Sequence, residues 1–212
     1  SRPEVNELLG HLPAPWRLGA QLMYGAGLRV SEAMSLRIKD LDFDNNTIQI
    51  HNAKGGKHRV VPLPQTLQPR LKTYLEELRF KHKAQLKNDC AAVHLPLSLQ
   101  RKYPKAALEF SWSFLFPATG LCAHPKTGKF ARYHLLEDSM QRQLKNALKK
   151  TAITKRVPCH TLRHSFATHL LNANADIRTL QDILGHADVS TTMIYLHLTD
   201  KKGAGAPSPL DL

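Results

Sequence analysis

The sequence has few cysteines and no long apolar run, and each shortage excludes a class of protein. The 212 residues include three cysteines, Cys90, Cys122 and Cys159, an odd number without the spacing of metal ligands. This argues against a disulfide framework and fits a reducing compartment. No stretch approaches the roughly 18 consecutive apolar residues that span a membrane, and residues 1–4 lack signal-peptide character. We therefore expect a bacterial cytoplasmic protein without a membrane partner.

A metal site is also disfavoured by what the sequence lacks. The chain holds 12 histidines but no Cys-x-x-Cys pair. His160, His164 and His169 are not accompanied by a glutamate placed as in the His-Glu-x-x-His motif. We therefore expect chemistry that uses neither a metal ion nor another cofactor.

Acidic residues are scarce relative to basic ones. Lys and Arg total 30 and Asp and Glu total 17, so the formal net charge is +13. An excess of this size is typical of proteins that bind a polyanion. Nucleic acid is favoured over a membrane surface as the partner.

Apolar periodicity predicts a mainly helical α+β domain. Apolar residues recur at helical spacing in four segments, around 15–24, 67–87, 136–148 and 162–170. Residues 47–50 and 59–63 favour strands, and the glycines at 55–56 suit the tight turn between them. The sequence thus predicts a small antiparallel β-hairpin with a basic tip that includes Lys54 and Lys57.

Short polar residues and glycine mark several helix boundaries. Ser31 is the predicted N-cap of one short helix, and Asp176 caps a helix that Gly185 ends. Ser190 is the predicted cap of the last helix, which carries Tyr195. The Gly- and Pro-rich residues 201–212 are expected to form an extended tail.

Residues 88–129 interrupt the helical pattern. Their prolines and the cluster Trp112, Phe114 and Phe116 predict an inserted subregion with at most one or two short helices. Phe114 and Phe116 alternate with polar or small neighbours, so we assign both to the core. The chain is therefore expected to be one large domain that carries an insertion.

Several residues suit the transfer of a phosphodiester bond without water or metal. That reaction needs a hydroxyl nucleophile, cations for the phosphate oxygens and an acid for the leaving oxygen. Arg29 and Arg163 suit the oxygens, because a guanidinium donates two parallel hydrogen bonds. His160 shares a helical face with Arg163. Taken singly, however, such a pair is usually a solvated helix face, and Tyr195 alone would be a core tyrosine.

The order of these residues resembles that of the tyrosine recombinase family. Gly27-Leu28-Arg29-Val30-Ser31-Glu32 is followed by a lysine in a hairpin turn, by a His-Thr-Leu-Arg-His-Ser-Phe-Ala-Thr-His run at 160–169, by Leu184-Gly185-His186 and by Tyr195. The resemblance extends from about Leu9 to His197. It implies a catalytic domain over residues 1–200, with the catalytic positions Arg29, Lys54, His160, Arg163, His186 and Tyr195.

The resemblance implies a role for the nucleophile and for the cations around it. Tyr195 matches the residue that attacks the scissile phosphate and stays joined to the 3′ end. Arg29 and Arg163 match the two arginines that clamp that phosphate. Glu32 lies where the family often has an acid that helps to hold an arginine.

The resemblance also implies the residues that move protons. Lys54 matches the lysine that protonates the leaving 5′ oxygen, and Lys57 is a weaker alternative for this role. His160 matches the acid or base beside the second arginine, and His186 matches the residue that supports the phosphate near the tyrosine. Cys159 and Asn174 depart from the commoner residues of the family, but neither replaces a catalytic group.

A narrower resemblance links the chain to integron integrases. It lies in residues 99–117, 176–181 and 208–211, and other tyrosine recombinases generally lack an insertion like 88–116. As a family, integron integrases act on double-stranded attachment sites and on folded single-stranded cassette sites, whose stems leave bases unpaired. Such bases need stacking surfaces. Trp112, Tyr133 and His134 are predicted to receive them, and Pro125 is predicted to line the same surface.

The resemblance implies a DNA partner and a homo-oligomer, a tetramer on DNA. It also implies an N-terminal core-binding domain that is absent from this chain. Three other functions compete with recombination. A silent DNA-binding module would fit residues 180–196 as a helix-turn-helix, a type IB topoisomerase would share the chemistry, and a zinc nuclease would need metal.

Overall fold

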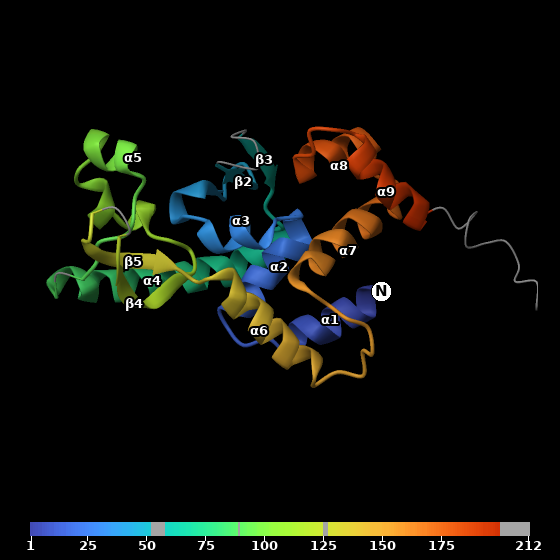
Figure 1. The fold of residues 1–212 in the computed structure, drawn as a ribbon, viewed down its shortest axis with the longest axis horizontal. Coiled ribbons are helices and arrows are strands. Elements are labelled where there is room, and N and C mark those ends of the chain that lie inside the picture. Colours follow the sequence, from blue (N-terminus) through green and yellow to red (C-terminus); the bar gives the residue numbers. More distant parts are fainter. Residues whose placement is uncertain (52–57, 89, 125–126, 200–212) are drawn as a thin grey trace, which may run out of the picture.

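Helices form most of the protein, together with two small sheets (Figure 1). The computed structural model describes residues 1–51, 58–88, 90–124 and 127–199. The α-helices are α1 (Arg2–Gly10), α2 (Trp16–Ala26), α3 (Val30–Ser35), α4 (Gln68–Lys87), α5 (Leu97–Lys102), α6 (Glu137–Leu148), α7 (Cys159–Leu171), α8 (Ile177–Leu184) and α9 (Ser190–Thr199). Short 3₁₀ helices lie at η1 (Ile38–Asp40), η2 (Gln65–Leu67), η3 (Ala106–Leu108) and η4 (Phe110–Trp112).

Both sheets are antiparallel. The first has the strand order β1 (Leu41–Asp42), β2 (Thr47–Ile50) and β3 (Arg59–Pro62), and the second pairs β4 (Pro117–Ala123) with β5 (Phe130–His134). Ile48 pairs with Val61, and both side chains are buried. The strands of the predicted hairpin are therefore confirmed, and so is the mainly helical α+β fold. The predicted tip, residues 52–57, lies outside the described residues.

The main core forms around α2, which buries Leu18, Leu22 and Met23. A helix with such a stripe is stabilised by the apolar area that it removes from water. Both predicted core aromatics are buried: Phe116 lies in this core, and Phe114 lies in a smaller cluster beneath the insertion. No helix among the described residues is both long and apolar enough to cross a membrane.

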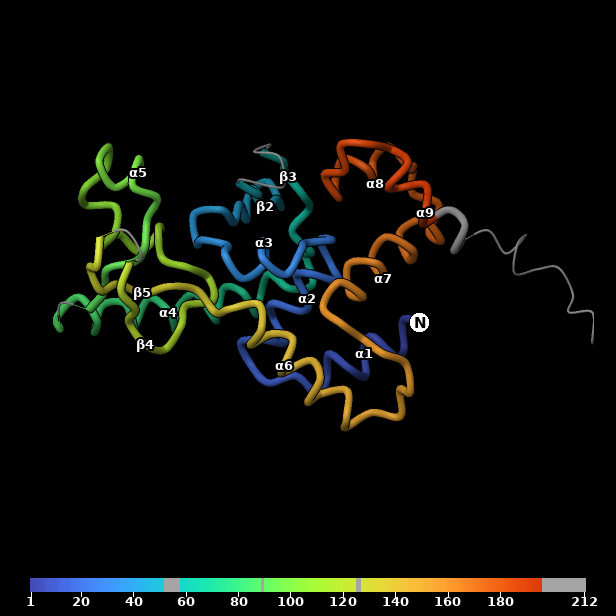
Figure 2. The backbone as a smooth tube through the Cα atoms, in the orientation of Figure 1, coloured from blue at the N-terminus to red at the C-terminus, as the bar shows by residue number. Residues whose placement is uncertain are grey.

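Residues 88–134 form a lobe at one end of the molecule, and α7 to α9 lie at the other end (Figures 1 and 2). The lobe contains the hairpin β4–β5, which the sequence pattern did not predict. Most of β4 is exposed, so its residues lack the apolar alternation that marks a half-buried strand. Arg37 attaches the lobe by donating hydrogen bonds to the carbonyls of Trp112 and His94.

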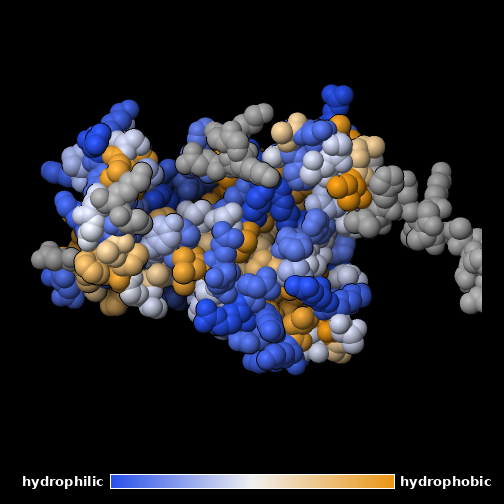
Figure 3. Space-filling model, in the orientation of Figure 1, coloured by the Kyte–Doolittle hydropathy of each residue, from blue (hydrophilic) through white to orange (hydrophobic). Residues whose placement is uncertain are grey.

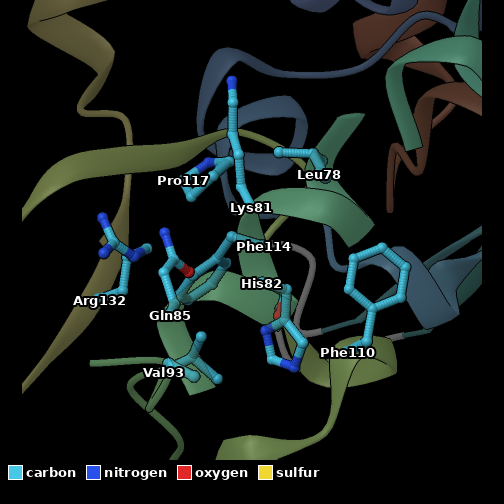
Figure 4. Close-up of a pocket in the computed structure, with 11 residues that line it drawn as sticks. Leu78, Lys81, His82, Gln85, Val93, Phe110, Phe114, Pro117 and Arg132 are labelled. Carbon is cyan, nitrogen blue, oxygen red and sulfur yellow. The ribbon is translucent and has the colours of Figure 1, made fainter. Parts of the chain in front are cut away.

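A cavity of about 40 Å³ lies beneath this lobe, beside α4 (Figure 4). Apolar side chains, including Leu78, Val93 and Phe114, line most of it. Among the described residues, the Nε of Arg132 is the one buried side-chain nitrogen or oxygen without a hydrogen-bond partner. The cavity has room for a water molecule, the usual partner of such a donor.

The C-terminal helices begin and end as the sequence predicts. The Asp176 carboxylate accepts a hydrogen bond from the N–H of Thr179 at 3.0 Å, which caps α8. Gly185 ends α8 in the left-handed conformation, with φ of 62°. This turn leads to α9, which lies against α7 and carries Tyr195.

Candidate active site

A tight turn between α2 and α3 sets the position of Arg29. Gly27 follows α2 with φ of 66°, and a Cβ at this position would lie 2.6 Å from Phe166. Only glycine fits, because the left-handed conformation and the close aromatic ring both exclude a side chain. The chain then extends at Arg29, which is the N-cap of α3.

The start of α3 differs from the prediction. Arg29 is the cap instead of Ser31, because the Glu32 carboxylate reaches back to the Arg29 N–H at 2.8 Å. The same carboxylate accepts a second hydrogen bond from Arg29 Nη1, also at 2.8 Å. Glu32 thus holds both the backbone and the side chain of Arg29. This agrees with the expectation that this acid helps to hold an arginine.

Arg163 is a buried cation between two helix ends. Its Nη1 donates to the carbonyl of Gly27 at 2.7 Å, and its Nη2 donates to the carbonyl of Leu184 at 2.6 Å. These carbonyls lie where α2 and α8 end, and helix C-termini carry partial negative charge. Burial lowers the pKa of Arg163 to about 10, so the guanidinium stays charged at neutral pH.

His186 lies directly after Gly185 and contacts Arg163. Arg163 Nη2 lies 3.2 Å from His186 Nε2, and a guanidinium can only donate, so Nε2 accepts. The proton therefore lies on Nδ1, which donates to the Thr192 hydroxyl at 2.9 Å. Burial, together with the charges of Arg163 and Arg29, lowers the pKa of His186 to about 4. The imidazole is neutral at physiological pH.

Tyr195 is buried between two imidazoles and an apolar cluster. Its ring stacks on His186 at a centroid distance of 6.4 Å and an interplanar angle of 9°, and the His164 ring is 5.4 Å away. Phe166 belongs to the same cluster as Tyr195. Burial raises the pKa of the Tyr195 phenol, although the charges of Arg163 and Arg29 lower it in part. The phenol is therefore neutral and has to lose its proton as it attacks.

His160 is more exposed than the other described catalytic positions. Its ring contacts His164 at 5.3 Å in an edge-on arrangement. His164 thus contacts both His160 and Tyr195. Sequence reasoning did not single out His164, although the residue lies inside the quoted run of ten residues.

Arg59 is a second residue that sequence reasoning missed. It donates two hydrogen bonds to Glu32, at 2.8 and 2.7 Å. A basic residue at the start of a strand carries no sequence signal of burial, because most such side chains face solvent. Lys54 and Lys57 lie outside the described residues, so their predicted roles stay predictions.

The structure thus brings together Arg29, Arg163, His186 and Tyr195. Two guanidinium groups can bind an anion, a phenol can attack it, and neutral imidazoles can accept the phenol proton. Among the described residues, no cluster of three or more His, Cys, Asp or Glu side chains is arranged to hold a metal ion.

A groove of about 1310 Å³ lies between α3, β2 and the lobe formed by residues 88–134. The predicted residues Trp112, Tyr133 and His134 all line it, whereas Pro125 lies outside the described residues. The Tyr133 and His134 rings are 4.0 Å apart, and both pack against Phe114. One wall of the groove is therefore aromatic.

Cations lie over the Trp112 ring in the same groove. The Lys39 ammonium is 4.7 Å from the ring centroid, and the Arg37 guanidinium is 5.8 Å from it. Tyr133 is 38% exposed, so part of its ring is accessible from solvent. Hydrophilic residues cover most of the face seen in Figure 3. The groove combines accessible rings with positive charge.

Comparison with known proteins identifies the family. The model of the phage integrase family matches residues 3–202 of this chain. The chain belongs to the phage integrase family. An "Integrase/recombinase" of Escherichia coli is 46% identical over 208 residues, which is 98% of this chain and 62% of the relative. "Tyrosine recombinase XerD" of Listeria monocytogenes serotype 4b (strain F2365) is 37% identical over 182 residues, covering 84% of this chain and 48% of the relative.

Solved structures of a recombinase and of an integrase share this fold. The crystal structure of XerA recombinase matches with a TM-score of 0.65 and 27% identity, covering 98% of this chain and 64% of that chain. The catalytic domain of bacteriophage HP1 integrase matches with a TM-score of 0.57 and 20% identity, covering 99% and 94%. The chain therefore has the fold of a catalytic domain in this family of recombinase enzymes, and it spans only part of the length of its curated relatives.

Proposed function

We propose that this chain is the catalytic part of a site-specific recombinase that cleaves and rejoins DNA through a covalent 3′-phosphotyrosine. The cluster of Arg29, Arg163, His186 and Tyr195 is the observation that carries this proposal. Tyr195 attacks the scissile phosphate, and the 5′ oxygen leaves with a proton. The covalent bond conserves the energy that rejoining needs.

The two arginines bind the non-bridging oxygens of the phosphate. A phosphodiester brings one negative charge to a site where three guanidinium groups surround one carboxylate, so its charge is attracted by the net positive charge. Arg163 is held by two helix ends, and Arg29 is held by Glu32. Preorganised donors of this kind stabilise the charge that develops in the transition state.

Proton transfer is assigned to the histidines and to the predicted hairpin lysine. A neutral imidazole beside Tyr195 accepts the phenol proton. His164 suits this role better than His186, because Nε2 of His186 already accepts a hydrogen bond from Arg163. His160, whose ring contacts that of His164, acts as an acid or base. Lys54 protonates the leaving 5′ oxygen, with Lys57 as the alternative donor.

We further propose that the substrates are integron recombination sites, including folded single-stranded cassette sites. The groove lined by Trp112, Tyr133 and His134 supports this, because its rings can stack on unpaired bases and its cations can contact the adjoining phosphates. Each stacked base contributes roughly 1–3 kcal/mol and tolerates sequence. Recognition by shape suits an enzyme that accepts many cassettes.

The proposed enzyme works as a homotetramer on DNA. Residues 1–200 form its catalytic domain, 88–116 its insertion and 201–212 its tail. A core-binding domain precedes this segment in the whole protein. The two relatives are longer than the segment that this chain matches, since the chain covers 62% of one and 48% of the other, which leaves room for a further domain.

Replacing Trp112 with alanine tests the cassette-site proposal. We expect binding to a bulged hairpin to weaken by roughly 5- to 150-fold, because one stacking surface of roughly 1–3 kcal/mol is lost. Binding to a fully paired duplex should change little. Titration of fluorescent DNA of both kinds measures the difference.

Phe80→Ala is the matched control for this experiment. Phe80 is 77% exposed on α4 and does not line the groove, so removal of its ring should leave the affinity for both DNAs unchanged. Equal losses on both DNAs after Trp112→Ala, or a drop in melting temperature that accounts for them, would assign Trp112 to the core alone.

A further inference from the structure

Arg59 joins three parts of the active site although it is none of the six predicted catalytic positions. Its Nη1 and Nη2 donate to the two carboxylate oxygens of Glu32 at 2.8 and 2.7 Å. Its Nε donates to the carbonyl of Ile183, near the end of α8, at 2.8 Å. The first residue of β3 is therefore bound to α3 and to α8 at once.

Arg59 is less accessible to a substrate than Arg29. Its side chain is 9% exposed, and all three of its guanidinium nitrogens donate to protein acceptors. Arg29, by comparison, is 27% exposed and donates to the same carboxylate from Nη1. Of the two arginines that donate hydrogen bonds to Glu32, Arg29 is therefore the one better placed to reach a phosphate.

We propose that Arg59 is a positioning residue, which holds Glu32 so that Glu32 directs Arg29 at the scissile phosphate. Its bond to Ile183 also fixes the end of α8, from which His186 is presented. This inference rests on the roles proposed above for Arg29 and Tyr195, and not on the cassette sites.

Gly185 supplies independent evidence that the chain accommodates Arg59 at this place. A Cβ at Gly185 would lie 2.9 Å from the Cδ of Arg59 and 3.2 Å from its Nε. The glycine before His186 therefore meets two requirements, a left-handed backbone and space for a buried arginine. This close packing means that displacement of Arg59 would move the residue next to His186.

The charges around Glu32 lower its pKa, and this shift depends on Arg59. Arg29 on α3, Arg59 on β3 and Arg163 on α7 face this carboxylate, the last at 3.9 Å. Burial alone would raise the pKa of Glu32, but the hydrogen bonds from Arg59 and Arg29 outweigh it and lower the pKa to about 2. Without Arg59 the buried carboxylate would take up a proton at higher pH and release Arg29.

The test is Arg59→Gln in the 212-residue chain, read in two ways. Carbon-13 NMR of the glutamate carboxyl groups, without DNA, should show that Glu32 titrates at higher pH than in the wild type. Single-turnover cleavage of a double-stranded attachment site, nicked beside the scissile phosphate, should slow by roughly 10- to 100-fold, because a misplaced Arg29 loses part of its contact with the phosphate in the transition state. The DNA affinity should stay unchanged, and the acid limb of the rate profile should move to higher pH.

Three further variants separate positioning from stability. Arg59→Lys keeps the charge and should recover part of the rate, and it serves as the test if Arg59→Gln does not fold. Glu32→Gln combined with Arg59→Gln should be no slower than the slower single variant, because the two residues act together. Arg70→Gln, an exposed arginine on α4, should match the wild type.

Two results would overturn the inference. An unchanged Glu32 titration with a loss of rate that is equal at every pH would show a role in stability alone. A loss of DNA affinity as large as the loss of rate would show that Arg59 contacts the phosphate itself. Because the titration is read without DNA, failure of the proposed function and failure of this inference are distinguishable.

Discussion

Tyr195→Phe is expected to abolish the covalent adduct with DNA and to leave DNA affinity unchanged. The substitution removes only the phenol oxygen, while Arg29 and Arg163 keep their partners in Glu32 and the helix ends. Without a nucleophile no phosphotyrosine can form, whereas the cations that bind the phosphate remain. Gel separation of protein–DNA adducts under denaturing conditions, together with a binding titration, measures both quantities.

A second tyrosine serves as the control for this variant. Tyr103 is 46% exposed in the lobe formed by residues 88–134, and Tyr103→Phe should form the adduct at the wild-type rate. Adduct formation by Tyr195→Phe would show that another residue is the nucleophile. A lower melting temperature is not expected, since the phenylalanine ring retains the apolar contacts with Phe166 and Leu180.

Arg163→Lys is expected to slow cleavage by roughly 100- to 1000-fold, the usual cost of removing a preorganised donor. A lysine carries all its N–H donors on one nitrogen, which cannot occupy both positions from which Nη1 and Nη2 donate to the carbonyls of Gly27 and Leu184. It also cannot offer a phosphate the planar pair of hydrogen bonds that a guanidinium provides. Single-turnover cleavage rates measure the loss.

The exposed Arg142 on α6 provides a matched conservative change. Arg142→Lys should cleave DNA at the wild-type rate, because an exposed charge tolerates this exchange. If Arg163→Lys retained the wild-type rate, the phosphate clamp would lie elsewhere in the molecule.

The order of motifs predicted four residues that the structure brings together, Arg29, Arg163, His186 and Tyr195, whereas Lys54 lies outside the described residues. Arg29 is far from the other three in the chain, and spacing alone says nothing about distance. Glycine supplied the structural reason for two of them: Gly27 turns the chain before Arg29, and Gly185 turns it before His186. Both glycines adopt the left-handed conformation that their place in the pattern implies.

Arg59, by contrast, could not be found from the sequence, because its role depends on contacts made across the fold. Glu32 and Ile183 are 27 and 124 residues away from it. The burial of Tyr195 was also underestimated. This burial raises the pKa of the phenol, although the charges of Arg163 and Arg29 lower it in part. Burial depends on how α9 packs against α7, which local patterns do not specify.

The structure of residues 88–134 could likewise be predicted only in part. Its aromatic residues could be sorted into buried Phe114 and Phe116 and groove-lining Trp112 and Tyr133 by the alternation of their neighbours and the charge around them. The hairpin β4–β5 could not be predicted, because exposed strands carry little apolar signal. The sequence also gave no indication that Arg37 would attach this lobe through backbone carbonyls.

Identification of the residue that carries DNA is the most direct test of the central claim. The chain is incubated with a nicked attachment site in the presence of EDTA, the adduct is digested with protease and nuclease, and the modified peptide is sequenced by mass spectrometry. We predict a nucleotide joined through its 3′ phosphate to Tyr195, with a yield that the chelator does not change. A nucleotide on any other residue, or cleavage without an adduct that the chelator stops, would contradict the account.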